Sequence, residues 1–275
     1  MIELINLNLG YRTRKPVLRE INLEIRPGII YGLLGKNGEG KTTLLNIISG
    51  QLFPDEGSCR TLDHVPGRRE ALFLQKVFLL PEEVQLPDVT ALAYIRMYAP
   101  FYPSFSDGIL KDCVESFGID LSASLRRMSL GQKKKVAIAL ALSVRTPLLL
   151  MDEPTNGLDI PSKSTFRKLL ASSLGEERTV IISTHQVRDL ESLIDAAIIL
   201  DDKEIIFNRT LEEISGKLDF RLVSEDEEAF YREASPAGMA GVTVNRTDVR
   251  STVSLELLFN AAICAKNEMK QMFND

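Results

Sequence analysis

The chain has 275 residues, of which 44% are hydrophobic and 26% are charged, and its formal net charge is −5. This composition is typical of a globular protein with one large or two small domains, and the acidic balance argues against a nucleic-acid partner. Three scattered cysteines (Cys59, Cys113 and Cys264) and two histidines exclude a disulfide framework and a cysteine- or histidine-rich metal centre.

Neither a signal peptide nor a membrane span is expected. The opening residues, MIELINLNLG, lack the basic and apolar regions of a signal peptide. The longest apolar run, 136–144, is interrupted by Ser143 and is far shorter than the roughly 18 to 20 residues that cross a bilayer. Any association with a membrane would therefore be peripheral.

The chain begins with a β-rich segment, residues 1–25, in which apolar and polar residues alternate. Residues 29–34 form a short apolar run, as in a strand buried on both faces. This run leads directly into the glycine-rich segment GKNGEGKTT, residues 35–43, and apolar residues then follow at helical spacing over 44–48. The order strand, glycine-rich loop, helix is therefore predicted.

The remaining elements are predicted from apolar runs and their spacing. Strands are predicted at 77–80, 148–151 and 179–183, and a hairpin at 196–200 and 204–207. Residues 88–145 are mostly helical in pattern, and 254–273 place apolar residues on roughly one helical face. Strands that alternate with helices favour a mostly parallel α/β sheet.

Residues 35–42 fit the phosphate-loop pattern G-x-x-x-x-G-K-[ST]. Glycines allow backbone N–H groups to surround phosphate oxygens, and the following helix adds a positive dipole. In this pattern Lys41 reaches the β and γ phosphates, and the Thr42 hydroxyl ligates Mg²⁺. The alternative, a glycine-rich turn with an exposed lysine, is disfavoured by the strand that precedes the loop and the helix that follows it.

Two carboxylates, Asp152 and Glu153, follow the apolar run at 148–151. In a phosphate-loop enzyme, an aspartate at the end of a neighbouring strand holds Mg²⁺. A glutamate one residue further on can position or deprotonate the attacking water. The alternative is a solvated acidic turn, which would be preferred if no phosphate loop were present.

Residues 1 to about 215 resemble the nucleotide-binding subunit of ABC (ATP-binding cassette) systems. The resemblance rests on five motifs that occur in the family's order. They are the Walker A loop GKNGEGKTT, the signature SLGQ at 129–132, the Walker B stretch LLLMDEP, the D-loop NGLD at 156–159, and the switch STH at 183–185. The signature motif distinguishes this family from other phosphate-loop ATPases.

The resemblance implies an α/β fold, with a phosphate-loop NTPase core, an N-terminal antiparallel β subdomain and an inserted helical subdomain at about 84–145. The nucleotide-binding domain would cover 1–209. Independently of the resemblance, the sequence changes character after about Arg209, which predicts a small C-terminal α+β appendage over 210–275.

The resemblance also assigns the site. It gives catalytic roles to Lys41, Glu153 and His185, and Mg²⁺ ligation to Thr42, Asp152 and Glu82. The nucleotide contacts that it implies are Tyr11, Gly35, Asn37, Gly38, Gly40, Lys41, Thr42, Thr43, Glu82, Ser129, Gly131, Gln132 and Asp159.

Three of these residues have alternative interpretations. Tyr11 stacks on adenine or is an ordinary strand tyrosine, and His185 contacts the γ-phosphate or is a strand-end histidine. We interpret Ser129 both as a helix N-cap and as a residue that faces the γ-phosphate of a partner subunit's ATP.

The chain departs from the family pattern at two positions. Leu130 replaces the first glycine of the usual signature L-S-G-G-Q, so its side chain must turn away from the nucleotide. Glu82 stands where the family carries a glutamine after a strand, since Gln75 precedes that strand. The alternative is that Glu82 is a solvated carboxylate one turn away from the site. The lysines at 133–135 are interpreted as a solvated helix face without a catalytic role.

As a whole, the resemblance implies an ATPase subunit that binds ATP and Mg²⁺ and pairs head-to-tail with a second copy or a homologous ATPase subunit. It would drive separate transmembrane permease subunits from a cytoplasmic, peripheral position on the inner face of the cell membrane. Residues 253–259 resemble the tail of exporting members, which favours export over import. The aromatic segment 97–105 either packs in the core or docks a partner.

Two other functions are alternatives to a transporter subunit. One is a soluble ABC ATPase without transport, as in iron–sulfur cluster assembly. The other is a regulatory or structural protein with an inactive site, which the intact motifs disfavour.

Overall fold

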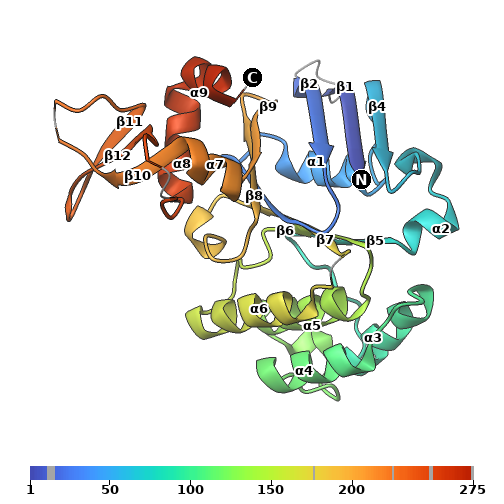
Figure 1. Cartoon of the computed structure of the whole chain (residues 1–275). Coiled ribbons are helices and arrows are strands. Elements are labelled where there is room, and N and C mark those ends of the chain that lie inside the picture. Colours follow the sequence, from blue (N-terminus) through green and yellow to red (C-terminus); the bar gives the residue numbers. More distant parts are fainter. Residues whose placement is uncertain (11–15, 176, 225, 248–249, 274–275) are drawn as a thin grey trace.

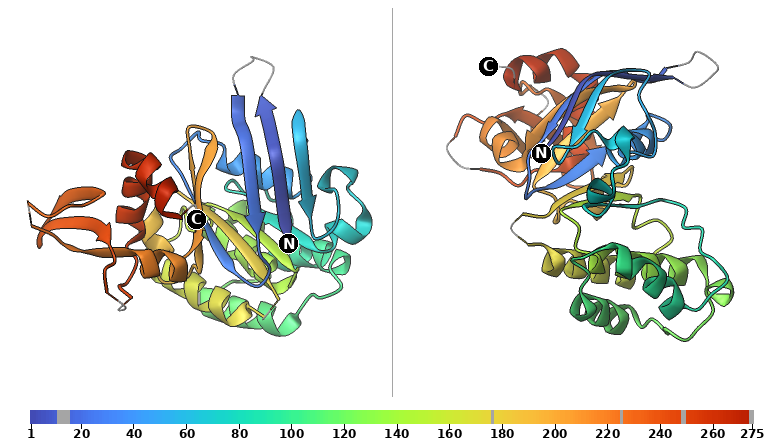
Figure 2. Two further views of the ribbon diagram at one scale, coloured as in Figure 1. Left: turned by 45° about the horizontal axis from the view of Figure 1, so that its top comes forward. Right: turned by 90° about the vertical axis from the view of Figure 1, so that its right-hand side faces the viewer.

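The computed structural model describes residues 1–10, 16–175, 177–224, 226–247 and 250–273. Helices α3 to α6 lie together on one side of the molecule, and strands β1, β2 and β4 lie on the opposite side (Figure 1). The C-terminal elements project from a third side, and two further views show the same arrangement (Figure 2). The predicted α/β fold with an antiparallel N-terminal sheet is confirmed.

A six-stranded sheet forms the centre of the molecule. Its strand order is β5 (Val77–Leu80), β6 (Leu148–Asp152), β7 (Thr179–Thr184), β3 (Ile30–Leu34), β8 (Ala196–Asp201) and β9 (Glu204–Thr210). Neighbouring strands from β5 to β8 run parallel, and β9 pairs with β8 antiparallel. Asp152 pairs with Ser183, and Leu34 pairs with Thr184, so the carboxyl ends of β6, β7 and β3 meet at one edge. Ligands of open parallel sheets bind at such an edge.

Two hydrophobic cores lie on the two faces of this sheet. Along β6, Leu149 and Met151 belong to one core, whereas Leu148 and Leu150 belong to the other. Because successive side chains of a strand point to opposite faces, a strand covered on both sides needs apolar residues at every position. This explains the continuous apolar runs in the sequence.

Helices cover one face of the sheet. They are α3 (Ala91–Tyr98), α4 (Asp107–Phe117), α5 (Leu130–Ser143) and α6 (Ile160–Ser173). The other face carries α1 (Lys41–Ile48) and the three-stranded antiparallel sheet of β1 (Ile2–Gly10), β2 (Pro16–Ile25) and β4 (Glu56–Thr61), which share the second core. A short helix, α2 (Ala71–Leu74), precedes β5.

The C-terminal segment forms a small α+β unit. It contains α7 (Leu211–Lys217), β10 (Leu218–Leu222), β11 (Tyr231–Ser235), β12 (Gly238–Val244), α8 (Leu255–Cys264) and α9 (Lys266–Phe273), with strand order β10-β12-β11. The apolar residues predicted to share a helical face over 254–273 are buried in one core, and the backbone leaves helical geometry at Ala265, so the segment consists of two helices. The Phe273 ring packs edge-on against Phe207, which ties this unit to β9.

Among the helices of the described residues, none is both long and apolar enough to traverse a bilayer.

Candidate nucleotide site

The glycine-rich loop joins β3 to α1, and its glycines are required by close backbone approaches. A Cβ atom on Gly35 would lie 2.7 Å from the carbonyl oxygen of Leu200, and one on Gly40 would lie 2.8 Å from that of Val17. Gly38 and Gly40 also have positive φ angles of 84° and 108°. Such angles are strained for residues that carry a side chain. The loop therefore curls tightly at the first turn of α1, as phosphate binding requires.

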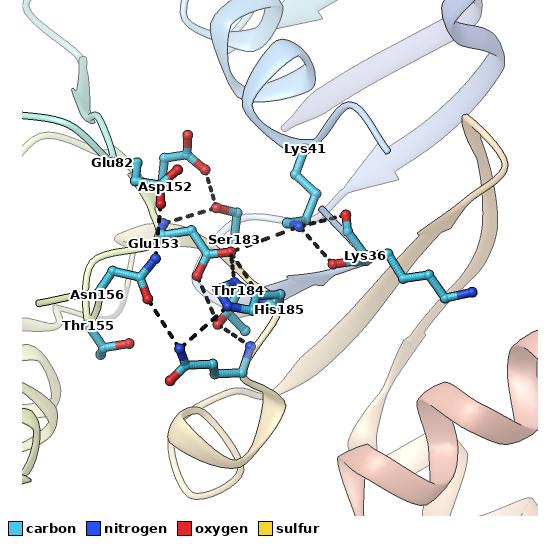
Figure 3. Close-up of polar contacts among 12 residues, drawn as sticks. Lys36, Lys41, Glu82, Asp152, Glu153, Thr155, Asn156, Ser183, Thr184 and His185 are labelled. Carbon is cyan, nitrogen blue, oxygen red and sulfur yellow. Dashed lines mark hydrogen bonds and ion pairs between the residues drawn. The ribbon is translucent and has the colours of Figure 1, made fainter. Parts of the chain in front are cut away.

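Lys41 is the central cation of the site. Its side chain is 6% exposed, and its ammonium donates to the carbonyl oxygens of Gly35 at 2.7 Å and Lys36 at 3.0 Å. The Glu153 carboxylate lies 3.9 Å away (Figure 3). Burial lowers the pKa of Lys41, while the negative charges of Glu153 and Asp152 act in the opposite direction. The ammonium is held inside the loop, at the place where the pattern predicts phosphate contacts.

Thr42 and Asp152 meet across the cavity although they are far apart in sequence. The Thr42 hydroxyl donates to Asp152 Oδ2 at 2.6 Å, and the Ser183 hydroxyl donates to Asp152 Oδ1. A hydroxyl and a carboxylate that converge are ligands of the hard type that Mg²⁺ prefers. The described residues contain no group of three His, Cys, Asp or Glu side chains that would hold a metal ion unaided. The Thr42–Asp152 pair thus has the ligand chemistry of the predicted Mg²⁺ site, and ligation of the ion stays a prediction.

Glu153 is fixed from three directions. Its main chain has φ 44°, an uncommon value for a residue other than glycine, and its N–H donates to the Ser183 hydroxyl at 3.1 Å. Oε1 accepts from the main-chain N–H of His185 at 2.9 Å and lies 2.8 Å from His185 Nδ1. Oε2 accepts from the Thr184 hydroxyl at 3.3 Å. Since Nδ1 faces a carboxylate, it carries the proton that is donated, and Nε2 of a neutral ring remains an acceptor.

The phosphate loop and the ends of the neighbouring strands enclose a cavity of about 290 Å³. The predicted residues that the structure brings together there are Asn37, Gly38, Gly40, Lys41, Thr42, Thr43, Glu82, Asp152, Glu153 and His185. Gly35 contributes the carbonyl that binds Lys41. Val17, which the sequence did not predict, also lines the cavity. Tyr11 lies outside the described residues.

The signature residues lie apart from this cavity. Ser129 caps α5, where its hydroxyl accepts from the N–H of Gln132 at 3.2 Å and Gln132 Oε1 accepts from the N–H of Ser129 at 2.8 Å. This reciprocal pair is a capping box. The Leu130 side chain is 81% exposed, and a Cβ atom on Gly131 would lie 3.0 Å from the carbonyl oxygen of Gly157. The signature and the D-loop are therefore neighbours.

Asp159, the last D-loop residue, caps α6 by accepting from the N–H of Ser162 at 2.8 Å. Among the described residues, the lining of the nucleotide cavity does not include Asp159, Ser129, Gly131 or Gln132. The predicted contact of Asp159 with nucleotide stays a prediction, as do those of the signature residues.

Several polar residues of the site received no role from the sequence, although Ser183, Thr184 and Asn156 lie in motifs named above. Ser183 and Thr184 bind the two carboxylates, Asn156 donates to Glu82 Oε1 at 3.0 Å, and Gln186 donates to Asn156 Oδ1 at 3.4 Å. Hydroxyls at the carboxyl end of a buried strand were an available signal for Ser183 and Thr184. The amide contacts depend on loops that are distant in sequence, so no local pattern indicates them.

The interpretation of all three lysines at 133–135 as a solvated face is wrong for one of them. Lys134 is 5% exposed, and its ammonium donates to the carbonyl oxygen of Glu82 at 2.8 Å. The second turn of α5 packs against the segment after β5, and this tertiary contact covers the lysine.

Comparisons with known proteins agree with this geometry. A family model described as ABC transporter matches residues 18–156. Two relatives from Bacillus subtilis are the ABC transporter ATP-binding protein NatA and the linearmycin resistance ATP-binding protein LnrL. NatA is 30% identical over 78% of this chain and 91% of its own length. LnrL is 29% identical over 79% of this chain and 72% of its own length.

A solved structure of a bacterial ABC transporter cassette, described as dimeric, superimposes with a TM-score of 0.67. It is 25% identical, and the alignment covers 76% of this chain and 98% of that one. The family match, the relatives and the assembled phosphate-loop site all agree. The chain belongs to the ABC transporter family and is one of its ATP-binding, ATP-hydrolysing cassettes.

Proposed function

We propose that this cassette is the ATPase subunit of a membrane transporter and that it uses Mg²⁺ with ATP. In this proposal two cassettes close head-to-tail around two nucleotides and drive separate transmembrane permease subunits. The observation that carries the proposal is the single cavity that gathers Lys41, Thr42, Asp152, Glu153 and His185.

The arrangement supports hydrolysis by positioning and electrostatics. Bound Mg²⁺, held by Thr42 and Asp152, would offset phosphate charge. Lys41 exchanges its loop carbonyls for phosphate oxygens, and this exchange keeps a buried ammonium fully hydrogen-bonded. Glu153 accepts a proton from the attacking water, and His185 orients that carboxylate through Nδ1 and the main chain.

Pairing of two cassettes would complete the site from the signature surface. Ser129 lies at the N-terminal end of α5, where the helix dipole favours an anion, and the exposed side chain of Leu130 leaves that end accessible. The dimeric state described for the related cassette supports this arrangement. Gly131 lies close to Gly157 of the D-loop, and in this proposal Asp159, which ends the D-loop, also faces the partner.

The permease is proposed to dock at the aromatic segment 97–105. Tyr102 packs against Phe78 in the core, whereas the side chains of Met97 and Phe101 are 53% and 67% exposed. Tyr98, Phe101 and Tyr102 line a cavity of about 550 Å³ beside β5. Exposed apolar surface next to a cavity supports docking of a partner, although part of the segment also serves the core.

We propose export as the direction and the inner face of the membrane as the location. The support is the tail-like stretch at 253–259 and the relative that is named for linearmycin resistance. The test is purification of the chain from its native membrane in mild detergent, followed by identification of what co-purifies. A pair of polytopic membrane subunits is the expected result. Recovery of iron–sulfur assembly factors in their place would refute the transport proposal.

A further inference from the structure

A second buried lysine lies beside the nucleotide cavity. The Lys134 ammonium donates to the carbonyl oxygen of Glu82 at 2.8 Å and to that of Pro81 at 3.4 Å. Since α5 begins directly after Ser129, Lys134 connects the helix that carries the signature to the segment that carries Glu82 in the same chain. The phosphate-loop pattern does not require this contact.

The charges around Lys134 are the carboxylates of the hydrolytic site. Burial lowers the pKa of Lys134, and the negative charges of Glu82, Asp152 and Glu153 oppose that shift. The same three carboxylates act on Lys41. Asp152 and Glu153 are buried, whereas Glu82 is exposed at the edge of the cavity. Two buried ammonium groups, one from the phosphate loop and one from α5, therefore lie near two buried carboxylates and a third at the surface. Removing either ammonium would leave buried negative charge without compensation, which is costly.

The segment that carries Glu82 is held at two points. Its main chain accepts from Lys134, and its carboxylate Oε1 accepts from the Asn156 amide at 3.0 Å. Asn156 in turn accepts from Gln186, which follows the switch residue His185. The D-loop and the switch thus hold the side chain of Glu82, while α5 holds its backbone.

We propose that Lys134 is a positioning residue for ATP hydrolysis, which holds the backbone of Glu82 against α5 and offsets the negative charge that Glu82 adds to the site. The family pattern has an uncharged glutamine where Glu82 stands, so this chain has one carboxylate more beside the phosphates. The buried lysine supplies the matching positive charge. This inference rests on the proposed position of Glu82 in the hydrolytic site.

The test compares wild type with Lys134→Met, Lys134→Arg, Lys133→Met and the double variant Glu82→Gln/Lys134→Met, all in the full chain. Methionine keeps most of the aliphatic stem and removes the charge. Lys133→Met is the matched control, because it removes the same charge from a side chain that points about 100° away around the helix. The measurements are kcat and KM with Mg²⁺, the Kd for ATP in EDTA, and the midpoint of thermal unfolding.

Lys134→Met is expected to lower kcat about tenfold or more while KM changes less than about threefold, because the site loses its geometry. In EDTA it should bind ATP about three- to tenfold more weakly, since one lysine instead of two opposes the carboxylates. Lys134→Arg should keep most of kcat, because it retains charge and donors, and Lys133→Met should match wild type. Glu82→Gln in the Lys134→Met background should restore the affinity in EDTA to within about twofold of wild type, because it removes one negative charge that repels phosphate and so offsets the loss of one positive charge.

Equal losses in Lys134→Met and Lys133→Met would overturn the proposal. So would a double variant that binds ATP in EDTA no better than Lys134→Met. General destabilisation by methionine does not imitate the expected pattern, because Glu82→Gln cannot repair a damaged helix. The comparison in EDTA does not depend on turnover or on a permease, so failure of the transport proposal is distinguishable from failure of this one.

Discussion

Glu153→Gln removes the carboxylate charge at the centre of the site and retains its shape. Oε1 of Glu153 faces the main-chain N–H and Nδ1 of His185 at 2.9 and 2.8 Å, and Oε2 faces the Thr184 hydroxyl at 3.3 Å. A glutamine oxygen can accept from His185, and its NH₂ group can donate to the Thr184 hydroxyl. We therefore expect the variant to fold as the wild type does.

The effects of Glu153→Gln on turnover and on ATP affinity follow from two free energies. Loss of a general base lowers kcat by about 10²- to 10⁴-fold, which corresponds to about 2.7–5.4 kcal/mol of activation free energy. The Lys41 ammonium lies 3.9 Å from Glu153 Oε1, and both side chains are buried. At an effective dielectric constant near 20, this pair attracts by about 4 kcal/mol. Glutamine removes that attraction before nucleotide binds, so Lys41 is more available to phosphate and ATP should bind at least as tightly.

The assay combines phosphate release, titration with a fluorescent ATP analogue and size exclusion with Mg²⁺-ATP. The expected result is loss of turnover, a Kd equal to or lower than that of wild type, and a dimer that persists with ATP. The exposed carboxylate Glu83 gives the matched control, because Glu83→Gln changes the same group outside the cavity. Turnover by Glu153→Gln within about tenfold of wild type would refute its role as the general base.

Ser129→Arg should abolish hydrolysis while the single chain still binds ATP. Mixing this variant with Lys41→Ala should restore partial phosphate release, because in a head-to-tail pair both defects fall in one composite site and the other site stays intact. Glu82→Gln should bind ATP more tightly than wild type in EDTA and gain less from Mg²⁺ in the same titration, because a carboxylate repels phosphate but attracts the cation. Arg178→Met should lower the free energy of unfolding in urea by about 1–3 kcal/mol, because the buried guanidinium donates to three carbonyls at and just beyond the end of α5. A thiol reagent should modify Cys264 alone in the native chain, since the other two cysteines are buried.

Each of these predictions has a contradicting result. Absence of recovery at every mixing ratio would contradict action across the dimer, and equal Mg²⁺ dependence would contradict a role of Glu82 toward Mg²⁺ and phosphate. An unchanged unfolding curve would show that the contacts of Arg178 add no net stability. Modification of a second thiol in the native chain would contradict the burial of the other cysteines.

The sequence determined the elements whose function depends on contiguous residues. The phosphate loop is one, because its glycines and Lys41 act through the backbone of one short segment. The strands of the central sheet are another, because burial on both faces requires continuous apolar runs. Strand β4 and the strands β10, β11 and β12 were not predicted, since they have exposed or small residues at many positions.

Only the tertiary structure determined how distant polar groups meet. Ser183 binds Asp152 because β6 and β7 are paired in parallel register, and that register is a property of the sheet. The three consecutive lysines of α5 look equivalent in the sequence, and which of them is buried depends on the loop that packs against the helix. Lys134 meets Glu82 because α5 lies beside the segment after β5, and a buried charge is stable only where the rest of the chain supplies its partners.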